Sequence, residues 1–298
     1  MNVKFRGNKS LFVGLITVDL QFIIPEYPKA NTKSKASHCE IHTGGPATNA
    51  AVTCAHLGGK VDLIAPIGKH IFSEYILEDI HKYGVSIIDP SACINSQPVF
   101  ASIISTLNNG NRTVFSYHPK IQYKNYDKLN LNFKDYKLAM FDGFYPEFAI
   151  SIANECRKTG IVTILDGGSW KPGTEELLDH IDIALCSNDF KPPGTAIPDE
   201  IFDLLHRKGV HYCAITRGKK SILYSGDDIN SEIEVKQVKV VDTLGAGDVF
   251  HGAFCYYYVN GFNFTDALKK ASLIAGESCK SYGARRWIKY FHIDNSSL

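Results

Sequence analysis

The 298-residue sequence has no excess of charge, with 32 basic against 31 acidic residues. A nucleic-acid-binding surface normally shows a basic excess or stripe, so no nucleic-acid partner is expected. Long apolar runs are missing too, because the run 11–16 is too short for a signal-peptide core or a membrane span. We therefore expect a cytoplasmic protein without a membrane partner.

The eight cysteines are widely spaced and form no C-x-x-C pair. Most lie in apolar contexts, as Cys186 and Cys213 do, where a thiol behaves as a small buried hydrophobe in a reducing compartment. The histidines show no metal-ligand spacing. With 44 % hydrophobic and 21 % charged residues, the composition is that of an ordinary globular protein with ample core.

Apolar strand-like runs alternate with helical periods over most of the chain. The predicted strands cover 11–16, 61–67, 138–141, 161–165, 183–186, 213–216 and 221–224. The predicted helices cover 47–57, 74–83, 147–158, 175–180 and 199–208. Near-continuous apolar strands separated by helices imply an α/β fold, with a parallel sheet that helices cover on both faces. We expect a single domain over residues 1–298.

Two stretches break this alternation, at about 22–42 and 97–117. Both are rich in β-formers with strand-like alternation. The second turns at 108–111, where Asn109-Gly110 is a strong hairpin signal. They predict a small antiparallel flap that stands off the main sheet; irregular loops are the alternative.

The most informative stretch is 238–254, where an apolar β-branched run (238–241) enters a glycine-rich turn that opens into a helical pattern. Gly245 and Gly247, on either side of Ala246, let the backbone turn sharply and approach a ligand. The N–H groups at the following helix start favour an anion. Asp248 would repel that anion unless it has a role there, and accepting a proton from a hydroxyl that attacks a phosphoryl group fits. A glycine turn that merely ends a strand is the alternative.

The sequence does not match two other nucleotide-binding loop motifs, because each lacks a required residue. A dinucleotide fingerprint starting at Gly245 needs glycine at 250, where the chain has Phe250. A P-loop needs Gly-Lys followed by Ser or Thr, but Gly218-Lys219 is followed by Lys220.

Two motifs carry a family resemblance. The stretch 242–248 reads DTLGAGD and resembles the C-terminal signature of the ribokinase-like (PfkB-type) carbohydrate kinases; 44–51 reads GGPATNAA and resembles their N-terminal signature. The resemblance extends from about residue 11 to about 285. It implies a three-layer α/β/α domain with a mostly parallel central sheet and a small β-rich lid over the sugar. The outer face of such a lid often mediates dimerisation, so a homodimer through the lid is expected.

The acceptor side of the site is predicted near the N-terminal signature. Asp19 follows the first predicted strand, where open parallel sheets bind ligands, and a carboxylate can accept hydrogen bonds from adjacent sugar hydroxyls; a helix or turn cap is the alternative. Gly44 and Gly45 precede the helix 47–57, whose first turn holds Asn49, although Gly-Gly-Pro is also a plain helix-start signal. The resemblance implies that Asp19, Gly45 and Asn49 contact the sugar.

Arg112, in a turn like that of ketohexokinases, either reaches the sugar or a phosphate or is a solvated hairpin arginine.

The nucleotide side is predicted around TRGKKS at 216–221, which resembles the family's T-x-G-x-x-G turn to nucleotide phosphates. Thr216 and Gly218 match, whereas Ser221 replaces the last glycine. Asn188 matches the family's N-x-x-E, but Lys191 stands where the resemblance implies a Glu that holds Mg²⁺ through water.

Either other carboxylates then organise Mg²⁺, such as Asp189 or Asp166, or the stretch 187–191 only marks a turn. The resemblance also implies that Asp242 orders a monovalent cation, K⁺ in many relatives.

The sequence thus predicts an ATP-dependent sugar kinase that transfers the γ-phosphoryl group to a primary hydroxyl. Asp248 would be the base, Gly245–Gly247 the anion hole, and Mg²⁺ the metal that bridges the phosphates. A non-catalytic sugar- or nucleotide-sensing protein of the same fold is the alternative. Ketohexoses, ribose, 2-keto-3-deoxy sugar acids and nucleosides all remain candidate acceptors, and Arg112 leans toward ketoses.

Overall fold

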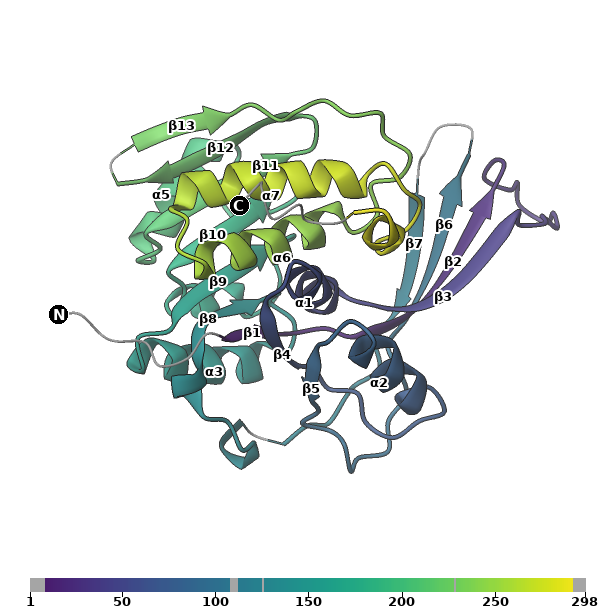
Figure 1. Ribbon diagram of the computed structural model, residues 1–298, viewed down its shortest axis with the longest axis horizontal. Helices are drawn as coiled ribbons and strands as arrows, with labels where there is room; N and C mark the ends of the chain where they lie inside the picture. Colours follow the sequence, from purple (N-terminus) through teal and green to yellow (C-terminus); the bar gives the residue numbers. More distant parts are fainter. Residues whose placement is uncertain (1–8, 108–111, 125, 228, 292–298) are drawn as a thin grey trace.

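The computed structural model describes residues 9–107, 112–124, 126–227 and 229–291. Its main feature is a nine-stranded sheet of order β13-β12-β11-β10-β9-β8-β1-β4-β5 (Figure 1). The strands are β1 (Lys9–Val13), β4 (Lys60–Ile64), β5 (Ser86–Ile88), β8 (Tyr136–Phe141), β9 (Val162–Gly167), β10 (Ile183–Ser187), β11 (Tyr212–Arg217), β12 (Lys220–Gly226) and β13 (Ile229–Ile233). Pairing is parallel from β5 to β11, and β12 and β13 continue it antiparallel.

Helices cover both faces of this sheet. One core lies under α1 (Pro46–His56), α2 (Ser73–His81), α6 (Ala246–Val259) and α7 (Phe264–Ser278). The other lies under α3 (Pro146–Lys158), α4 (Thr174–Leu178) and α5 (Pro198–Arg207). Short 3-10 turns complete the chain: η1 (Tyr126–Lys128), η2 (Phe133–Asp135) and η3 (Arg286–Lys289). The predicted three-layer α/β/α architecture is confirmed.

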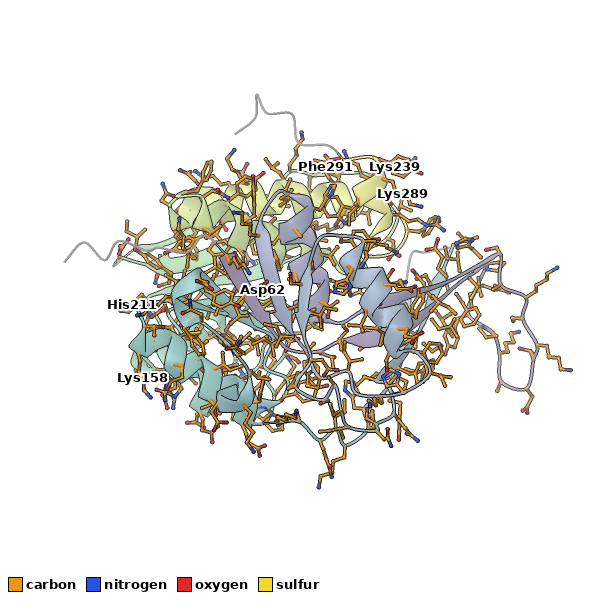
Figure 2. The ribbon with its side chains drawn as sticks, turned by 60° about the horizontal axis from the view of Figure 1, so that its bottom comes forward. Asp62, Lys158, His211, Lys239, Lys289 and Phe291 are labelled. Carbon is orange, nitrogen blue, oxygen red and sulfur yellow. The ribbon has the colours of Figure 1, made fainter. Side chains whose placement is uncertain are left out.

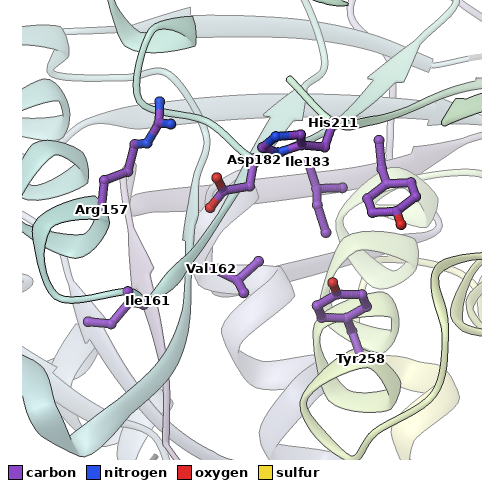
Figure 3. A pocket seen from close by; sticks show the side chains of 9 residues that line it. Arg157, Ile161, Val162, Asp182, Ile183, His211 and Tyr258 are labelled. Carbon is purple, nitrogen blue, oxygen red and sulfur yellow. The ribbon is translucent and has the colours of Figure 1, made fainter. Parts of the chain in front are cut away.

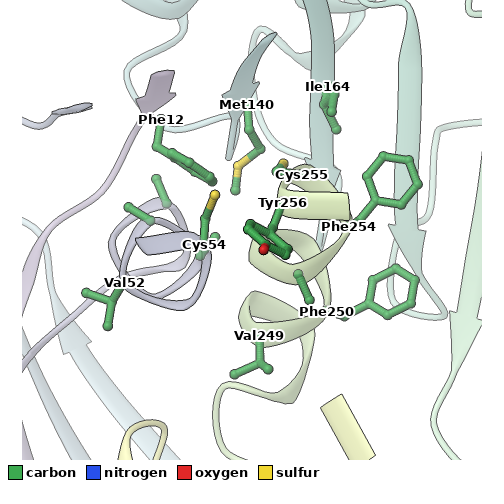
Figure 4. Close-up of a cluster of buried hydrophobic side chains, with 14 of the residues drawn as sticks. Phe12, Val52, Cys54, Met140, Ile164, Val249, Phe250, Phe254, Cys255 and Tyr256 are labelled. Atoms are coloured by element: carbon green, nitrogen blue, oxygen red, sulfur yellow. The ribbon is translucent and has the colours of Figure 1, made fainter. Parts of the chain in front are cut away.

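Helices α1 and α6 lie side by side against the sheet (Figure 4). Their backbones meet at Gly252, where an added Cβ would lie 2.2 Å from the carbonyl oxygen of Ala50. Around this contact Val52, Val249 and Phe250 are almost fully buried. The close crossing brings the first turns of the two helices, which hold Asn49 and Asp248, next to each other.

A second, four-stranded sheet of order β3-β2-β6-β7 projects from the body (Figures 1 and 2). Its strands are β2 (Thr17–Ile24), β3 (His38–Gly44), β6 (Phe100–Thr106) and β7 (Arg112–Tyr117). We call this sheet the lid. It is not purely antiparallel as predicted, because β2 and β6 pair in parallel.

The first lid strand begins at Thr17 rather than near residue 22. Asp19 therefore lies within a lid strand and not in the loop after β1. The signal for this strand is weak because residues on both of its faces are partly or fully covered, which hides the alternation. The predicted hairpin turn at 108–111 falls outside the described residues.

The apolar β-branched run 238–241 does not form a strand. The N–H groups of Val241 and Asp242 donate to the carbonyl oxygen of Cys279, at 2.8 and 3.2 Å. The segment thus bonds to the end of α7 and not to a neighbouring strand. Strands β5 and β13, which were not predicted, are short and partly exposed.

No helix in the described part of the chain combines the length and apolarity needed to cross a membrane. The eight cysteines, all of which are described, are free thiols, and five of them are buried.

Candidate active site

The sheet changes its winding direction between β1 and β8, because the chain leaves β1 toward β4 on one side and β8 toward β9 on the other. Ligands of open α/β sheets bind in the crevice at such a switch point. At the end of β8, Asp142 accepts hydrogen bonds from the N–H groups of Leu15 (2.8 Å) and Ala47 (3.2 Å). It joins the loop after β1 to the start of α1. Burial raises the pKa of Asp142 to about 6.

Asp142 was missed by sequence reasoning, although an acid directly after the apolar run 138–141 was a usable signal. Gly14 makes room for it, since a Cβ there would lie 2.1 Å from its Oδ1.

Helix α6 begins at Ala246 after Gly245, whose φ of +72° suits glycine. A Cβ on Gly245 would approach the Cβ of Ala284 to 2.6 Å. The N–H of Ala246 donates to the carbonyl oxygen of Thr243. The N–H groups of Gly247 and Asp248 have no acceptor within the helix, because they belong to its first turn. This is the backbone arrangement that an anion hole requires.

Asp248 lies partly buried in that first turn, and its Oδ2 accepts a hydrogen bond of 2.8 Å from Nδ2 of Asn49. Burial and the negative charge of Asp166 raise the pKa of Asp248 to about 7, against the effect of the Asn49 bond. A carboxyl group that is half ionised at neutral pH is well suited to accept a proton.

His251, one turn further along α6, is buried and has a packing role. Its Nδ1 lies 2.6 Å from the carbonyl oxygen of Gly247 and its Nε2 3.0 Å from that of Leu185. The same Nε2 is 3.5 Å from Oδ1 of Asp166, which ends β9. Both ring nitrogens of His251 thus lie within hydrogen-bond distance of backbone carbonyl oxygens.

Asp19 faces inward from β2. The hydroxyl of Thr17 donates to its Oδ1 at 2.5 Å, and Nε2 of His42 lies 3.6 Å from its Oδ2. Gly44 is needed beside it, because a Cβ there would lie 1.9 Å from Oδ2. Burial raises the pKa of Asp19 to about 6, while burial and the charge of Arg285 lower that of His42 to about 4. Near pH 7 a carboxylate thus faces a neutral imidazole.

Gly45 caps α1 with a φ of 102°, and a Cβ there would lie 2.3 Å from the carbonyl oxygen of Leu15. The two glycines of the N-terminal signature are therefore both required by close packing around the switch point.

Asn49 connects two groups. While its Nδ2 donates to Asp248, its Oδ1 accepts from Nε and Nη2 of Arg285, at 3.4 and 3.3 Å. Nη1 of Arg285 donates to Oδ2 of Asp79 at 2.9 Å. Neither Arg285 nor Asp79 was predicted, because nothing in their local sequence marks them.

The lid contacts the anion-hole loop. Nη1 of Arg112 donates to the hydroxyl of Thr243 at 3.1 Å, so this arginine is not simply solvated. Gln21 of β2 donates to Oδ2 of Asp242 at 3.3 Å.

Asp242 also accepts from the N–H groups of Gly283 (3.0 Å, on Oδ2) and Leu244 (2.9 Å, on Oδ1). Three N–H donors thus hold its carboxylate, which braces the loop. Among the described residues no cluster of three or more His, Cys, Asp and Glu side chains could hold a metal ion.

The predicted nucleotide residues lie at the carboxyl ends of β10 and β11. Thr216 donates to the carbonyl oxygen of Cys186 at 3.3 Å, and Gly218 takes a φ of +62° in the tight turn to β12. Asn188 and Lys191 are exposed after β10. A hollow of about 450 Å³ beside the turn is lined by Arg217, Lys219, Lys220, Ser221, Glu234, Val235 and Gln237.

A second hollow, of about 400 Å³, opens at the amino ends of β9, β10 and β11 (Figure 3). Arg157, Asp182, His211 and Tyr258 line it. His211 lies at the end of the body away from the lid (Figure 2). None of the predicted site residues is part of it.

Comparison with known proteins agrees with this geometry. The family model described as pfkB family carbohydrate kinase matches residues 8–289. The deoxyribokinase of Salmonella typhi is 26 % identical over 293 residues, which cover 92 % of this chain and 93 % of that protein.

Solved structures share the fold. A ribokinase from Thermotoga maritima has a TM-score of 0.78 and 20 % identity, with 95 % of this chain and 98 % of the other covered. A structure of Arabidopsis thaliana ribokinase complexed with ribose and ATP has a TM-score of 0.74 and 19 % identity, with 97 % and 100 % covered. On the family match over nearly its whole length, the chain belongs to the pfkB family of carbohydrate kinases.

Proposed function

We propose that this kinase uses ATP to phosphorylate a primary hydroxyl of a small sugar or sugar derivative, with Asp248 as the general base. The observation that carries the proposal is the position of Asp248 in the first turn of α6, beside N–H groups that the helix leaves without acceptors. Its pKa of about 7 suits proton acceptance at neutral pH. The family membership and the ribokinase structure with ribose and ATP support the choice of substrates.

In the proposed reaction the acceptor hydroxyl gives its proton to Asp248 while its oxygen attacks the γ-phosphorus. The bond from the γ-phosphorus to the bridging oxygen breaks, and ADP leaves with that oxygen. N–H groups of the turn 245–248 stabilise the charge on the transferring oxygens. Asp19, with its Oδ2 opposite a neutral His42, holds acceptor hydroxyls on the lid side.

A bound Mg²⁺ would supply positive charge that neutralises the phosphates. It usually keeps several waters and takes only one or two protein carboxylates, so the lack of a dense acidic cluster among the described residues fits this metal. Asp166, near the end of β9, and Asp189, after β10, are the carboxylates that would hold it in place of the family Glu that Lys191 replaces. The basic hollow beside 216–221 suits the nucleotide phosphates.

The outer face of the lid supports pairing with a second copy of the chain. Ile41, Phe100, Phe115 and Tyr117 project from the face opposite Asp19 and are all more than a third exposed. We propose a homodimer through this face.

The test is release of ADP from MgATP in the presence of ribose, deoxyribose, ketohexoses, 2-keto-3-deoxy sugar acids and nucleosides. One or a few of them should support turnover in the wild type. Asp248→Asn keeps the shape and removes the basicity, so kcat should fall about 10²- to 10⁴-fold while ATP still binds. A near-wild-type kcat in Asp248→Asn would overturn the mechanism, and binding of sugars without any turnover would point to the non-catalytic alternative.

A further inference from the structure

Arg285 is a buried arginine whose guanidinium lies between the acceptor side of the site and α2. Only 8 % of the residue is exposed, and Arg285 follows Ala284, the residue that packs on Gly245. Two of its nitrogens contact Oδ1 of Asn49, and the third donates to Asp79. We propose that Arg285 is a positioning residue that fixes the amide of Asn49, so that Nδ2 of Asn49 always donates to Asp248. The proposal rests on the role of Asp248 as the base.

The argument depends on what each group can donate or accept. An asparagine amide has an accepting oxygen and a donating nitrogen at opposite corners, and it can rotate by half a turn. A guanidinium can only donate, and an ionised carboxylate can only accept. With Arg285 on one side and Asp248 on the other, only the observed orientation satisfies both contacts. Without Arg285 the amide can rotate, so its oxygen can accept from the protonated carboxyl of Asp248, and the Nδ2 bond that favours the ionised carboxylate is made for less of the time.

Arg285 is itself firmly held. Oδ2 of Asp79 also accepts from the N–H of Thr43 at 3.1 Å, and Lys82 donates to Oδ1. Burial disfavours the charged form of Asp79, but Arg285, Lys82 and the Thr43 bond hold its pKa below the ordinary value. The ring of Tyr83 lies 5.1 Å from the guanidinium carbon. A guanidinium anchored in this way can orient a neighbouring amide.

The groups around Asp248 determine in which direction its pKa shifts when the Asn49 bond is lost. Asp166 and Asp19 disfavour its ionised form, whereas the Asn49 bond and His251 favour it. Arg285 also acts electrostatically on Asp19 and on His42. Loss of the Asn49 bond therefore raises the pKa of Asp248 and moves the acid limb of the kcat profile to higher pH.

The decisive variant is the double substitution Arg285→Met with Asp79→Asn. Methionine keeps the volume without a donor, and asparagine leaves no buried charge unpaired, a replacement that proteins often tolerate. The amide oxygen that Asp79→Asn introduces can still accept from the N–H of Thr43. We expect the acid limb to shift up by about one pH unit, with kcat about fivefold lower at pH 7 and within about twofold of the wild type at pH 9.

Arg286→Ala is the matched control, because this neighbouring arginine pairs with Glu40 of the lid and does not touch Asn49. Its acid limb should stay at the wild-type position. Adding the double substitution to Asn49→Ala should not shift the limb further, since the two changes remove the same contact. Thermal melting shows that each variant is folded.

Two outcomes would overturn the proposal. One is an acid limb that stays in place in the Arg285 variant while the Asp248→Asn control is inactive; the other is a loss of kcat that is the same at every pH. If Asp248→Asn itself retains activity, the proposed base is wrong, which is a separate and recognisable result.

Discussion

As the proposed base, Asp248 must ionise at a position where burial opposes its negative charge. Its pKa rises from an ordinary 3.8 to about 7, chiefly through burial. The folded protein therefore binds this proton more tightly than the unfolded chain does. The corresponding stability is present at low pH and is lost as the pH rises toward 7 and above. Ionisation of Asp248, which the proposed activity at neutral pH requires, thus lowers the free energy of unfolding.

Asp248→Asn should accordingly stabilise the fold while it abolishes turnover. Because asparagine does not ionise, its melting temperature should exceed that of the wild type by a few degrees at pH 8 and by less at pH 5. Asp189→Asn, an exposed acid at the same edge of the sheet, is the control and should leave melting unchanged. A melting temperature at pH 8 equal to or below that of the wild type would show that the charge of Asp248 is well solvated.

Substitutions of Asp19 and Asn49 should change different kinetic constants. Leaving a sugar hydroxyl without its partner costs about 1–3 kcal/mol, so Asp19→Ala should raise the acceptor KM roughly 5- to 150-fold and leave the ATP KM within a small factor. Asn49→Ala should instead lower kcat, because Asn49 donates to Asp248. If both variants only melt earlier, while the acceptor KM of Asp19→Ala and the kcat of Asn49→Ala stay unchanged, both residues have purely structural roles.

The residues that the sequence could predict are those whose signal is local. Asp248 lies within its own glycine-rich turn, and Asp19 follows the first predicted strand. Asp142 directly follows an apolar run, but its partner Leu15 lies 127 positions away. Arg285 acts on a partner 236 positions away, and nothing in its local sequence marks it. Their roles depend on how the elements pack.

At the scale of elements, buried strands and long helices were predictable because their apolar runs are continuous or periodic. The start of β2 was placed too late, because both of its faces are covered and the alternation that marks a half-exposed strand is absent. At 238–241 the apolar residues are β-formers, but their hydrogen-bond partner is the end of α7. Tertiary context overrides β propensity at 238–241.

The crossing of α1 and α6 depends on one glycine. Gly252→Ala would place a methyl group 2.2 Å from the carbonyl oxygen of Ala50, and such overpacking costs about 1–3 kcal/mol. Gly276→Ala in α7 is the matched control. Its Cβ would meet only Val238 at an ordinary 3.6 Å, and the helix should gain about 0.5–1 kcal/mol. Denaturant unfolding measures both; if the two variants change stability equally, the helix contact is looser than the structure indicates.

At the scale of the whole molecule, the proposed site is formed between the two sheets. The body would supply Asp248 and the proposed anion-hole loop, and the lid would supply Asp19 and Arg112. Arg112 contacts Thr243, and Arg286 contacts Glu40, so the lid touches the body at two separate points. A sugar held between the two sheets would be shielded from water, which phosphoryl transfer to a sugar rather than to water requires.

The outer face of the lid has an apolar surface that the body does not cover. Phe115 is 56 % exposed and lies across the strands from Leu20 and Ile41, on the face opposite Asp19. Contiguous exposed apolar side chains usually mark a binding surface. Phe115→Lys should therefore convert a dimer into a monomer in sedimentation velocity. Leu273→Lys, which removes a similarly exposed residue from α7, should leave the dimer intact. A wild-type protein that sediments as a monomer at every concentration would exclude the dimer, and a dimer that survives Phe115→Lys would place its interface elsewhere.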